Sequence, residues 1–464
     1  MKNSDIILAT SLSILISISC FGQQGNYQFN NYGNRSMLLS GNVTGSVQDL
    51  GLTYYNPSRL TTLQTGGLAI SAKAFQMTQV KLSNFLEEDT TVSNKDFNSI
   101  PSLAGSTFNL FNSKFAISFI NKSSINTNIN YRGTPTEADI FQSSPELEQY
   151  KLDYSLHNQL DDEWFGLTWA VKVNQQISLG ISSFVSVFRH RGLKNLNTTV
   201  IETDDNISYF QKTIGFDQKS YGLFLKLGAN YELDNINLGL NISIPYIEVI
   251  KSGAFRYKEL IIDWISPEDT YYEYDLNDLK TTRKEPLSIA IGAGIQLKKY
   301  IFHINLEYTA GLKKYNQIDI PPLDIGEDSP FTPKYTDQRK GVLNFGLGIE
   351  YHLKEKVKLY TSFSSDVNAI VRDTSDETLN NLNLGDSYFH LGFGWDWELN
   401  WSNIVMGATY TGGGNSFVNP LTAENYLQNQ EYQPNWKYRR WQFVVGIEIP
   451  FIKDKLTEIE DLFK

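Results

Sequence analysis

The last strong hydrophobic stretch of this chain alternates between large apolar residues and small or polar ones. Its apolar positions are Trp441, Phe443, Val445, Ile447 and Ile449. The residues between them are polar or small, with Val444 as the exception. A period of two predicts a β-strand with two chemically different faces. In a soluble sandwich the apolar face would point into a shared core, whereas in a transmembrane barrel it would face lipid.

The same alternation recurs in about 14 segments that turn residues separate, so we predict an all-β protein. The predicted strands are 67–79, 102–110, 115–130, 164–173, 177–189, 219–232, 236–249, 287–297, 300–312, 341–352, 357–371, 387–398, 402–411 and 438–451. The first two alternate least clearly. No segment after the N-terminus is apolar enough to cross a membrane as a helix.

The connections between these strands are sorted by length. Every link that follows an even-numbered strand is a tight turn. The links that follow odd-numbered strands are long, at 82–101, 132–163, 192–218, 250–286, 313–340, 372–386 and 412–437. This sorting predicts a transmembrane antiparallel β-barrel of about 14 strands over residues 65–452, with short periplasmic turns and long extracellular loops.

The two faces of the predicted strands agree with a barrel. Aromatic residues make up 13% of the chain, which suits the girdles at a membrane interface. The inward face carries many glycines: Gly228, Gly239, Gly292, Gly294, Gly346, Gly348, Gly392 and Gly394. The simpler interpretation is that they give room for curvature and packing, and the alternative is that they leave space for a plug or a permeant.

The N-terminus has the pattern of a secretory signal peptide over residues 1–22. Lys2 is followed by an apolar stretch too short to span a bilayer, and cleavage after Gly22 would leave Gln23 first. Cys20 is the only cysteine, and its lipidation is the alternative to its removal with the signal peptide. A cleaved signal peptide together with many amphipathic strands predicts a location in the outer membrane of a bacterium.

Residues 23–64 precede the first strand, and the part from Gly33 onward does not alternate. It contains Tyr54-Tyr55-Asn56-Pro57 followed by Leu60, where the Asn-Pro pair indicates a turn or a helix start. An ordered, partly apolar segment before a barrel is best buried in the lumen. Together with the small residues 40–45 and the acidic Asp49, this segment resembles the hatch of the FadL and TodX family of outer-membrane transport proteins. Ser58 is a mild departure from the family's alanine or glycine.

The resemblance implies passive uptake of hydrophobic small molecules, namely long-chain fatty acids or aromatic hydrocarbons. It also implies a movable hatch and a ligand that leaves sideways through the barrel wall. Only Asn56 and Pro57 carry over residue by residue, so the ligand-binding residues are unknown. The glutamine after the cleavage site looks like a protein of the Bacteroidetes. In that group barrels of this kind also serve in secretion machinery, as PorV does, so an interaction barrel of an envelope complex is the alternative function.

The sequence disfavours enzymatic, metal-binding and nucleic-acid-binding functions. The five histidines (His157, His190, His303, His352 and His390) lack metal-ligand spacing, and no nucleophile elbow is present, although His303 or His390 beside a lumen serine is conceivable. A net charge of −11 disfavours nucleic acid. We therefore expect no catalytic residues, no cofactor and no metal, with solvation as the simplest role for the acidic residues of 250–286.

We make a specific prediction for each of three further segments. Gly412-Gly413-Gly414 is interpreted as the flexible start of a loop, because the lysine of a phosphate-binding loop is missing. Lys122-Ser123-Ser124 interrupts the third strand and is the candidate for a kink that opens the wall. Residues 453–464 form a short amphipathic periplasmic tail, which either caps the barrel or docks a partner.

Overall fold

The computed structural model describes residues 25–63, 67–84, 91–110, 113–137, 147–202, 206–262, 269–326, 330–371, 386–400, 402–416 and 435–450. The predicted signal peptide, Cys20 and the tail 453–464 lie outside these residues. Within the described part of the chain, no helix is long and apolar enough to cross a membrane.

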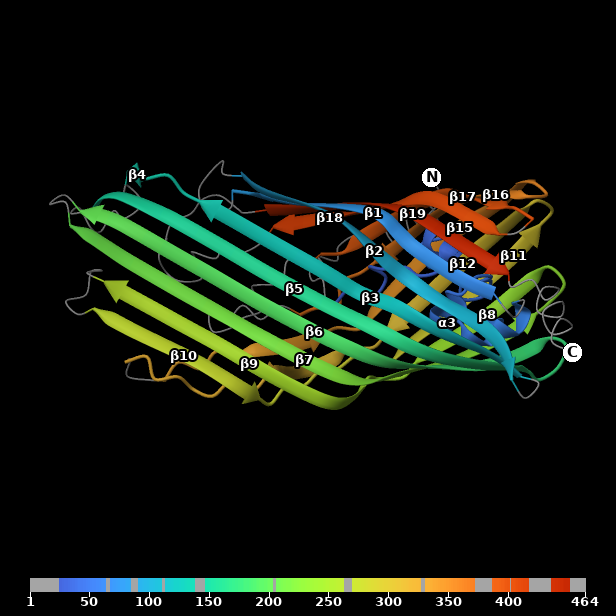
Figure 1. Cartoon of the computed structure of the whole chain (residues 1–464), viewed down its shortest axis with the longest axis horizontal. Helices are drawn as coiled ribbons and strands as arrows, with labels where there is room; N and C mark the ends of the chain where they lie inside the picture. Colours follow the sequence, from blue (N-terminus) through green and yellow to red (C-terminus); the bar gives the residue numbers. More distant parts are fainter. Residues whose placement is uncertain are drawn as a thin grey trace, which may run out of the picture.

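Long antiparallel strands form most of the described chain (Figure 1). They are β1 (Gly67–Ser83), β2 (Thr91–Leu110), β3 (Ser113–Arg132), β4 (Thr136–Glu137), β5 (Leu147–Lys172), β6 (Ile177–Glu202), β7 (Ile207–Glu232), β8 (Ile236–Ser243), β9 (Ile247–Ile262), β10 (Thr270–Leu279), β11 (Ser288–Leu297), β12 (Tyr300–Thr309), β13 (Leu312–Ile318), β14 (Tyr335–Arg339), β15 (Val342–Lys354), β16 (Val357–Asp366), β17 (Tyr388–Glu398), β18 (Asn403–Ser416) and β19 (Asn435–Pro450).

The wall closes on itself because β19 pairs with β1 along its whole length. Two wall strands are interrupted midway. β8 and β9 both pair with β7, while β11 pairs with β8 and β10 pairs with β9. Counting each interrupted pair once, and leaving out β4 and the β13–β14 hairpin, the barrel has 14 strands, so the predicted fold class is confirmed.

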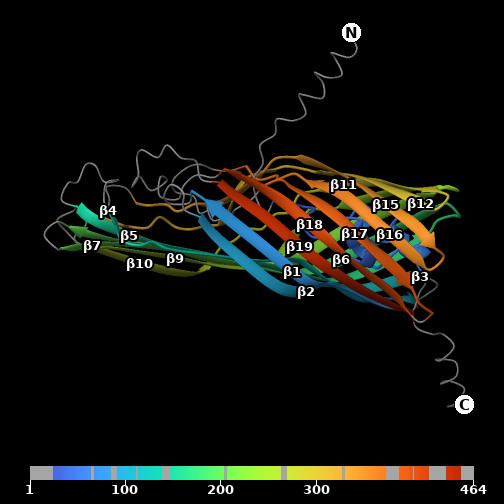
Figure 2. The same cartoon turned by 90° about the horizontal axis from the view of Figure 1, so that it is seen from above.

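Four predicted loops are wrong, because much of each is strand. In the predicted loop 82–101, β2 already begins at Thr91. β5 begins inside the predicted loop 132–163, β6 and β7 extend through most of 192–218, and β9 and β10 occupy much of 250–286. These strands project beyond the rest of the wall at the end opposite the tight turns (Figures 1 and 2). We call this projection the extension, its end of the barrel the loop end, and the opposite end the turn end.

The cause of this error is a change of face along each strand. In the part of β5 nearer the turn end, the outward residues are apolar and exposed, such as Phe165 and Leu167. In the part of β5 between Glu163 and the loop end, the outward residues are polar. There Leu156 and Leu160 point inward and are buried. The period of two continues, but the apolar set moves to the other face, because the extension has left the lipid and covers a core of its own.

Two smaller differences concern the ends of strands. Gly412, Gly413 and Gly414 pair with β19 inside β18, so the interpretation of these glycines as a flexible loop start is wrong. The hairpin of β13 and β14 lies inside the predicted loop 313–340. Arg339 of β14 forms an isolated antiparallel β-bridge with Ile370, so the hairpin contacts the segment that follows β16.

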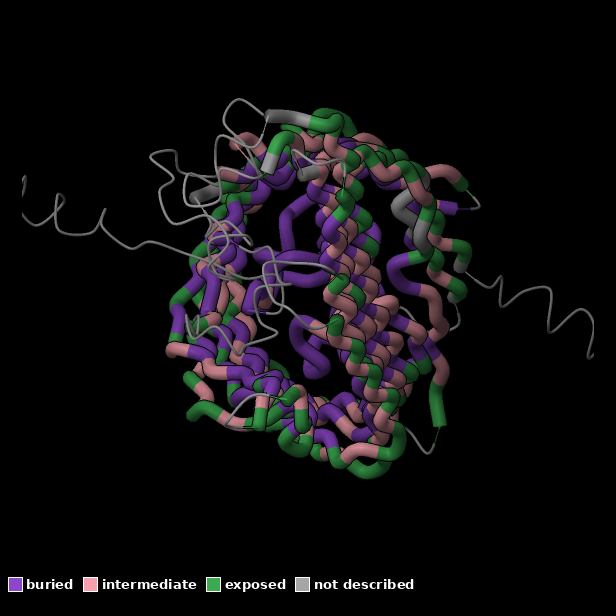
Figure 3. The backbone as a smooth tube through the Cα atoms, turned by 90° about the vertical axis from the view of Figure 1, so that its left-hand side faces the viewer, coloured by how far each residue is buried: buried purple, intermediate pink, exposed green. Residues whose placement is uncertain are grey.

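The N-terminal residues 25–63, which we call the hatch, lie inside the barrel. The hatch holds the short helices α2 (Asn34–Leu38) and α3 (Leu52–Tyr55) and the 3-10 helix η2 (Pro57–Thr62). Figure 3 looks along the barrel and shows buried chain inside the ring of the wall. The hatch and the turn-end half of the wall form one hydrophobic cluster, and the extension and the loop-end half form another.

Candidate functional site: the hatch and the lumen

Asn56 fixes the hatch both to itself and to the wall. Its Oδ1 accepts hydrogen bonds from the backbone N–H (3.2 Å) and the hydroxyl (2.6 Å) of Ser58, so it caps η2. Its Nδ2 donates to the carbonyl oxygens of Thr44 (2.8 Å) and of Ala229 in β7 (3.1 Å). Pro57 at the first position of η2 needs no hydrogen-bond acceptor for its nitrogen. The predicted motif therefore positions the hatch against β7.

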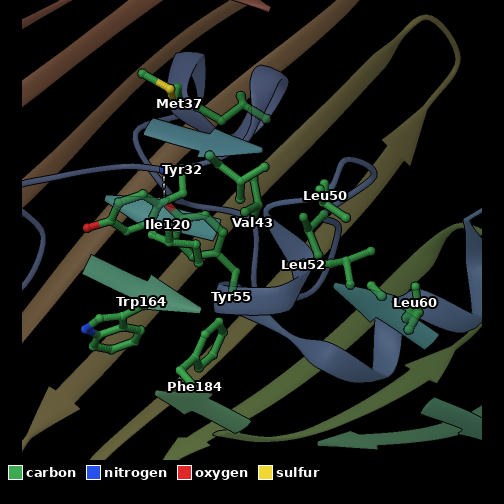
Figure 4. Close-up of a cluster of buried hydrophobic side chains, with 14 of the residues drawn as sticks. Tyr32, Met37, Val43, Leu50, Leu52, Tyr55, Leu60, Ile120, Trp164 and Phe184 are labelled. Atoms are coloured by element: carbon green, nitrogen blue, oxygen red, sulfur yellow. Dashed lines mark hydrogen bonds between the residues drawn. The ribbon is translucent and has the colours of Figure 1, made fainter. Parts of the chain in front are cut away.

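The other residues of the motif pack into the hatch cluster (Figure 4). Leu60 and Tyr55 are buried, and the Tyr55 hydroxyl accepts a hydrogen bond from the backbone N–H of Tyr32 (3.1 Å). Tyr54 is only partly buried and packs edge-on against Tyr32, with 4.8 Å between ring centroids. Tyr54 is thus the member of the motif whose ring faces the lumen.

Charged residues also tie the hatch together and to the wall. Asp49 accepts hydrogen bonds from the backbone N–H of Ser36 and of Gly51, which closes the turn between α2 and α3. Burial raises the pKa of Asp49, although the hydrogen bonds from Ser36 oppose that shift. Arg35 pairs with Asp396 of β17 at 2.7 Å, and Arg59 pairs with Glu232 of β7 at 3.3 Å.

The inward glycines of the wall mark the path of the hatch. A Cβ atom at any of the eight predicted positions would meet hatch atoms. The contacts are Asn56 and Pro57 at Gly228, Thr44 at Gly239, Gly45 and Thr44 at Gly292, Ser46 at Gly294, Asn42 at Gly346, Leu39 at Gly348 and Leu38 at Gly392 and Gly394. The alternative interpretation, space for a plug, is therefore correct for these positions. Gly180, Gly407 and Gly446 behave in the same way and were not singled out in the sequence.

The conceivable serine–histidine pair is a contact between hatch and wall. The Ser46 hydroxyl lies 2.7 Å from Nδ1 of His303 in β12, and Nε2 of His303 lies 3.9 Å from Glu350. All three side chains are buried, so the Ser46 hydroxyl has no open approach for a substrate. His390 bonds to Thr411 and Asp366 of neighbouring strands. No group of acidic, histidine or cysteine side chains in the described part of the chain has the arrangement of a metal site.

The hatch separates two cavities. The one towards the loop end, which we call the lumen cavity, has a volume of about 130 Å³ and is lined by Tyr54 and the start of the hatch. The one towards the turn end has a volume of about 490 Å³ and is lined by Asp49, Arg59 and Leu63. The two cavities share no lining residue, so the hatch is the barrier between them.

Aromatic rings form one side of the lumen cavity. Trp164 of β5 stacks on Phe224 of β7 at 4.2 Å between centroids, and Phe224 packs against Tyr246 at 4.7 Å. Tyr54 of the hatch lies 5.9 Å from Trp164. Tyr54, Trp164 and Phe224 line the cavity and give it an apolar surface at the level of the hatch.

Charged side chains form the other side. Arg283 pairs with Asp162 at 2.7 Å, and Arg339 pairs with Glu285 at 2.7 Å. The ammonium groups of two lysines approach the ring of Tyr54. They lie 4.0 Å (Lys226) and 5.2 Å (Lys122) from its centroid. The cavity is therefore amphipathic rather than apolar.

The wall is incomplete beside this cavity, between β2 and β3. Their ladder runs from Leu110↔Ser113 to Leu103↔Ile120, and no ladder pair joins the two strands beyond it among the described residues. Pro101 follows on β2 and cannot donate to a ladder, and β3 has a bulge at Lys122, where kinking was predicted. We call the stretch without ladder pairs the wall gap, and the side chain of Asn94 spans it by donating a hydrogen bond to the carbonyl oxygen of Asn128.

A third, small cavity lies in the wall gap. Its volume is about 30 Å³, and it is lined from β2 by Asn94, Asp96 and Asn98 and from β3 by residues 124–127. Phe29 of the hatch and Ile125 of β3 line both this cavity and the lumen cavity. The two cavities are thus neighbours, and these two side chains lie between them.

The structure defines a class of protein: a 14-stranded antiparallel barrel whose lumen is filled at one end by its own N-terminal segment. Solved structures with this fold include the toluene transporter TodX of Pseudomonas putida, at 11% identity and a TM-score of 0.55, over 91% of this chain and 99% of that one. A Pseudomonas aeruginosa FadL homologue is 9% identical with a TM-score of 0.55, over 92% and 100%. The Ralstonia pickettii toluene transporter TbuX is 10% identical with a TM-score of 0.54, over 91% and 99%.

These likenesses show that the chain shares the fold of the FadL-type outer-membrane barrels. No protein-family model matches the sequence, and no curated protein matches it either. What the chain transports or binds is therefore argued from its own lumen.

The residues of the lumen cavity were missed in the sequence, although one of them carried a signal. Lys226 occupies an inward position of a strand whose outward neighbours Leu225 and Leu227 are apolar, which marks it as a lumen charge. Asp162 and Arg283 lie in segments that the sequence analysis interprets as loops. The sequence pattern therefore did not indicate that their side chains point inward.

Proposed function

We propose that this protein is an outer-membrane channel for the passive entry of hydrophobic small molecules, with the loop end facing the exterior. The observation that carries the proposal is that only the side chains of Phe29 and Ile125, which line both cavities, lie between the lumen cavity and the cavity in the wall gap. Such a path lets a molecule enter from the loop end, rest beside the aromatic rings and leave sideways into lipid. It passes only the first part of the hatch, whereas the straight route is blocked by the hatch as a whole.

Passage requires side chains to move. The lumen cavity of about 130 Å³ is smaller than the roughly 300–1,000 Å³ of common ligand sites. Phe29 belongs to the start of the hatch, before α2, and is held by Arg440, whose guanidinium lies 3.9 Å from the ring centroid. We propose that displacement of this first part of the hatch widens the path.

The charges of the cavity favour long-chain fatty acids over aromatic hydrocarbons. Lys122 and Lys226 form no ion pair with any residue that the structure describes, whereas Arg283 and Arg339 are each paired. A carboxylate placed above Tyr54 would meet both ammonium groups, and an alkyl chain would lie along Trp164 and Phe224. Lys226 also donates a hydrogen bond to the hydroxyl of Ser243 (2.8 Å), but a hydrocarbon would leave both cations without an anionic partner.

Uptake by cells or by liposomes that contain the purified protein tests the proposal. We expect deletion of the protein to slow the entry of long-chain fatty acids and, to a smaller extent, of alkyl aromatics. Unchanged uptake over a broad panel of both classes would remove the proposal.

The second candidate is an interaction barrel of an envelope complex, as in PorV-like proteins. The outward face of the extension favours it, because besides polar side chains it exposes Leu193, Ile207 and Tyr271, which a partner protein could contact. Affinity purification in mild detergent discriminates between the two. A stable protein partner would favour the complex, and a lone barrel that retains a lipid-like ligand would favour transport.

A further inference from the structure

Four cations gather on the outward face of β19, β1 and β2, where these strands leave the apolar band. They are Lys437 and Arg439 of β19, Lys81 of β1 and Lys95 of β2, and all four are exposed. Lys437 lies directly opposite Lys81 in the ladder. In the next outward row, Gln79 lies between Arg439 and Lys95. We call these four residues the cation shelf.

Within the described part of the chain, the cation shelf has no carboxylate partner. None of its four side chains forms an ion pair or hydrogen bond with any residue that the structure describes. By contrast, Arg189 and Arg191 on the outward face of β6 both pair with Asp217, at 2.8 and 3.0 Å. Like charges directly opposite each other in a ladder are destabilising. Such a cluster in a chain of net charge −11 indicates that an external anion compensates it.

The surroundings of the shelf fit a lipid headgroup. The next outward row towards the turn end is apolar and exposed, and consists of Trp441, Met77 and Phe97. On the β18 side the shelf is flanked by Gly412 and Gly414, which present no side chains above it. The cations thus lie in an open position at the edge of the apolar band, which is the level of lipid headgroups.

We propose that the cation shelf binds the phosphate groups of a phosphorylated lipid in the outer leaflet, whose acyl chains lie along the apolar row. The row of Lys81 and Lys437 and the row of Arg439 and Lys95 are two residues apart along the strands. Together they can contact more than one phosphate of the same lipid. The proposal rests on the orientation given above, with the loop end outside, but it does not depend on what the lumen transports.

Binding to the full chain in phosphatidylcholine nanodiscs, titrated with diphosphorylated lipid A, tests the proposal. We expect Lys81→Gln/Lys437→Gln to weaken binding about 30-fold, which corresponds to about 1 kcal/mol for each of the two charges. The matched control is Lys151→Gln/Arg256→Gln. It removes the same charge from the outward face of the extension, where each cation already has a carboxylate partner. We expect the control to bind as the native chain does.

Several results would overturn the proposal. One is equal weakening in the shelf variant and the control, which would show an effect of net charge alone. Another is binding of inorganic pyrophosphate as tightly as the lipid, which would point to a soluble anion. If Lys81→Gln/Lys437→Gln does not fold, Lys95→Gln/Arg439→Gln tests the second row in its place, and unchanged lipid binding there contradicts the proposal. Loss of uptake function with intact lipid binding would affect only the proposed transport.

Discussion

At the scale of single residues, Asn56 joins the parts of the hatch to the wall. One side chain caps η2, holds the carbonyl oxygen of Thr44 and holds that of Ala229. We expect Asn56→Ala to destabilise the seated hatch by about 2 kcal/mol, because a cap is lost and two buried carbonyl oxygens lose their donor. Hydrogen exchange should then be roughly 30-fold faster in residues 25–63 and unchanged in the barrel strands.

Asn56→Asp is the matched control for this variant. It keeps the oxygen that caps η2 and removes the amide that donates to Thr44 and Ala229. An intermediate exchange rate would separate the two roles. Unchanged exchange in Asn56→Ala would mean that the motif does not hold the hatch in place.

Lys226 offers a residue-scale test of the ligand's chemistry. We expect Lys226→Met to slow uptake of a long-chain fatty acid about tenfold or more, because a charge-assisted hydrogen bond to the carboxylate is worth about 1.5–3 kcal/mol. Uptake of an alkyl aromatic of similar size should be unchanged. An equal loss for both substrates would indicate that Lys226 acts through the shape of the cavity instead.

At the scale of elements, the fit between hatch and wall depends on glycines that bring the two backbones close together. At Gly239 of β8 an added Cβ would meet the carbonyl oxygen of Thr44, which belongs to backbone and cannot swing away. We expect Gly239→Ala to displace the hatch and to raise the passage of small solutes in a liposome swelling assay.

Gly215 of β7 provides the control, because a Cβ there would first meet a flexible leucine side chain at 3.0 Å. We expect Gly215→Ala to leave swelling rates as they are in the native chain. Equal swelling rates for Gly239→Ala and the native chain would show that the hatch tolerates displacement without opening the lumen.

The elements also show how far the sequence could predict the fold. Alternation located the strand segments that lie in the apolar band, as in 164–173 of β5 and 219–232 of β7. It failed in the extension, because there the apolar set changes face and the rule of apolar residues outside no longer applies. Where the apolar residues next to a predicted strand change from the outward to the inward positions, the strand thus continues and no loop begins.

The candidate site could be predicted in part. The hatch motif and the glycines that face it were visible as sequence patterns, and the bulge at Lys122 lies where the strand pattern breaks. The lumen cavity was not visible, because it brings together residues as distant as Tyr54, Trp164 and Arg283. Only the closed barrel places them around one space.

At the scale of the whole molecule, the proposed transport depends on the wall gap. Asn98 of β2 and Ser124 of β3 line the small cavity in that gap from its two sides. A pair of cysteines at these positions could be bridged by a short bis-thiol reagent to close the gap. The control pair is Thr107→Cys/Ala116→Cys, whose positions are already ladder partners in β2 and β3.

The most direct test is fatty-acid uptake by Asn98→Cys/Ser124→Cys before and after bridging with a reagent that a reductant cleaves. We expect bridging to reduce uptake at least tenfold, reduction to restore it, and the control pair to show neither effect. Full uptake with the gap bridged would contradict the sideways route and would favour exit past the hatch instead.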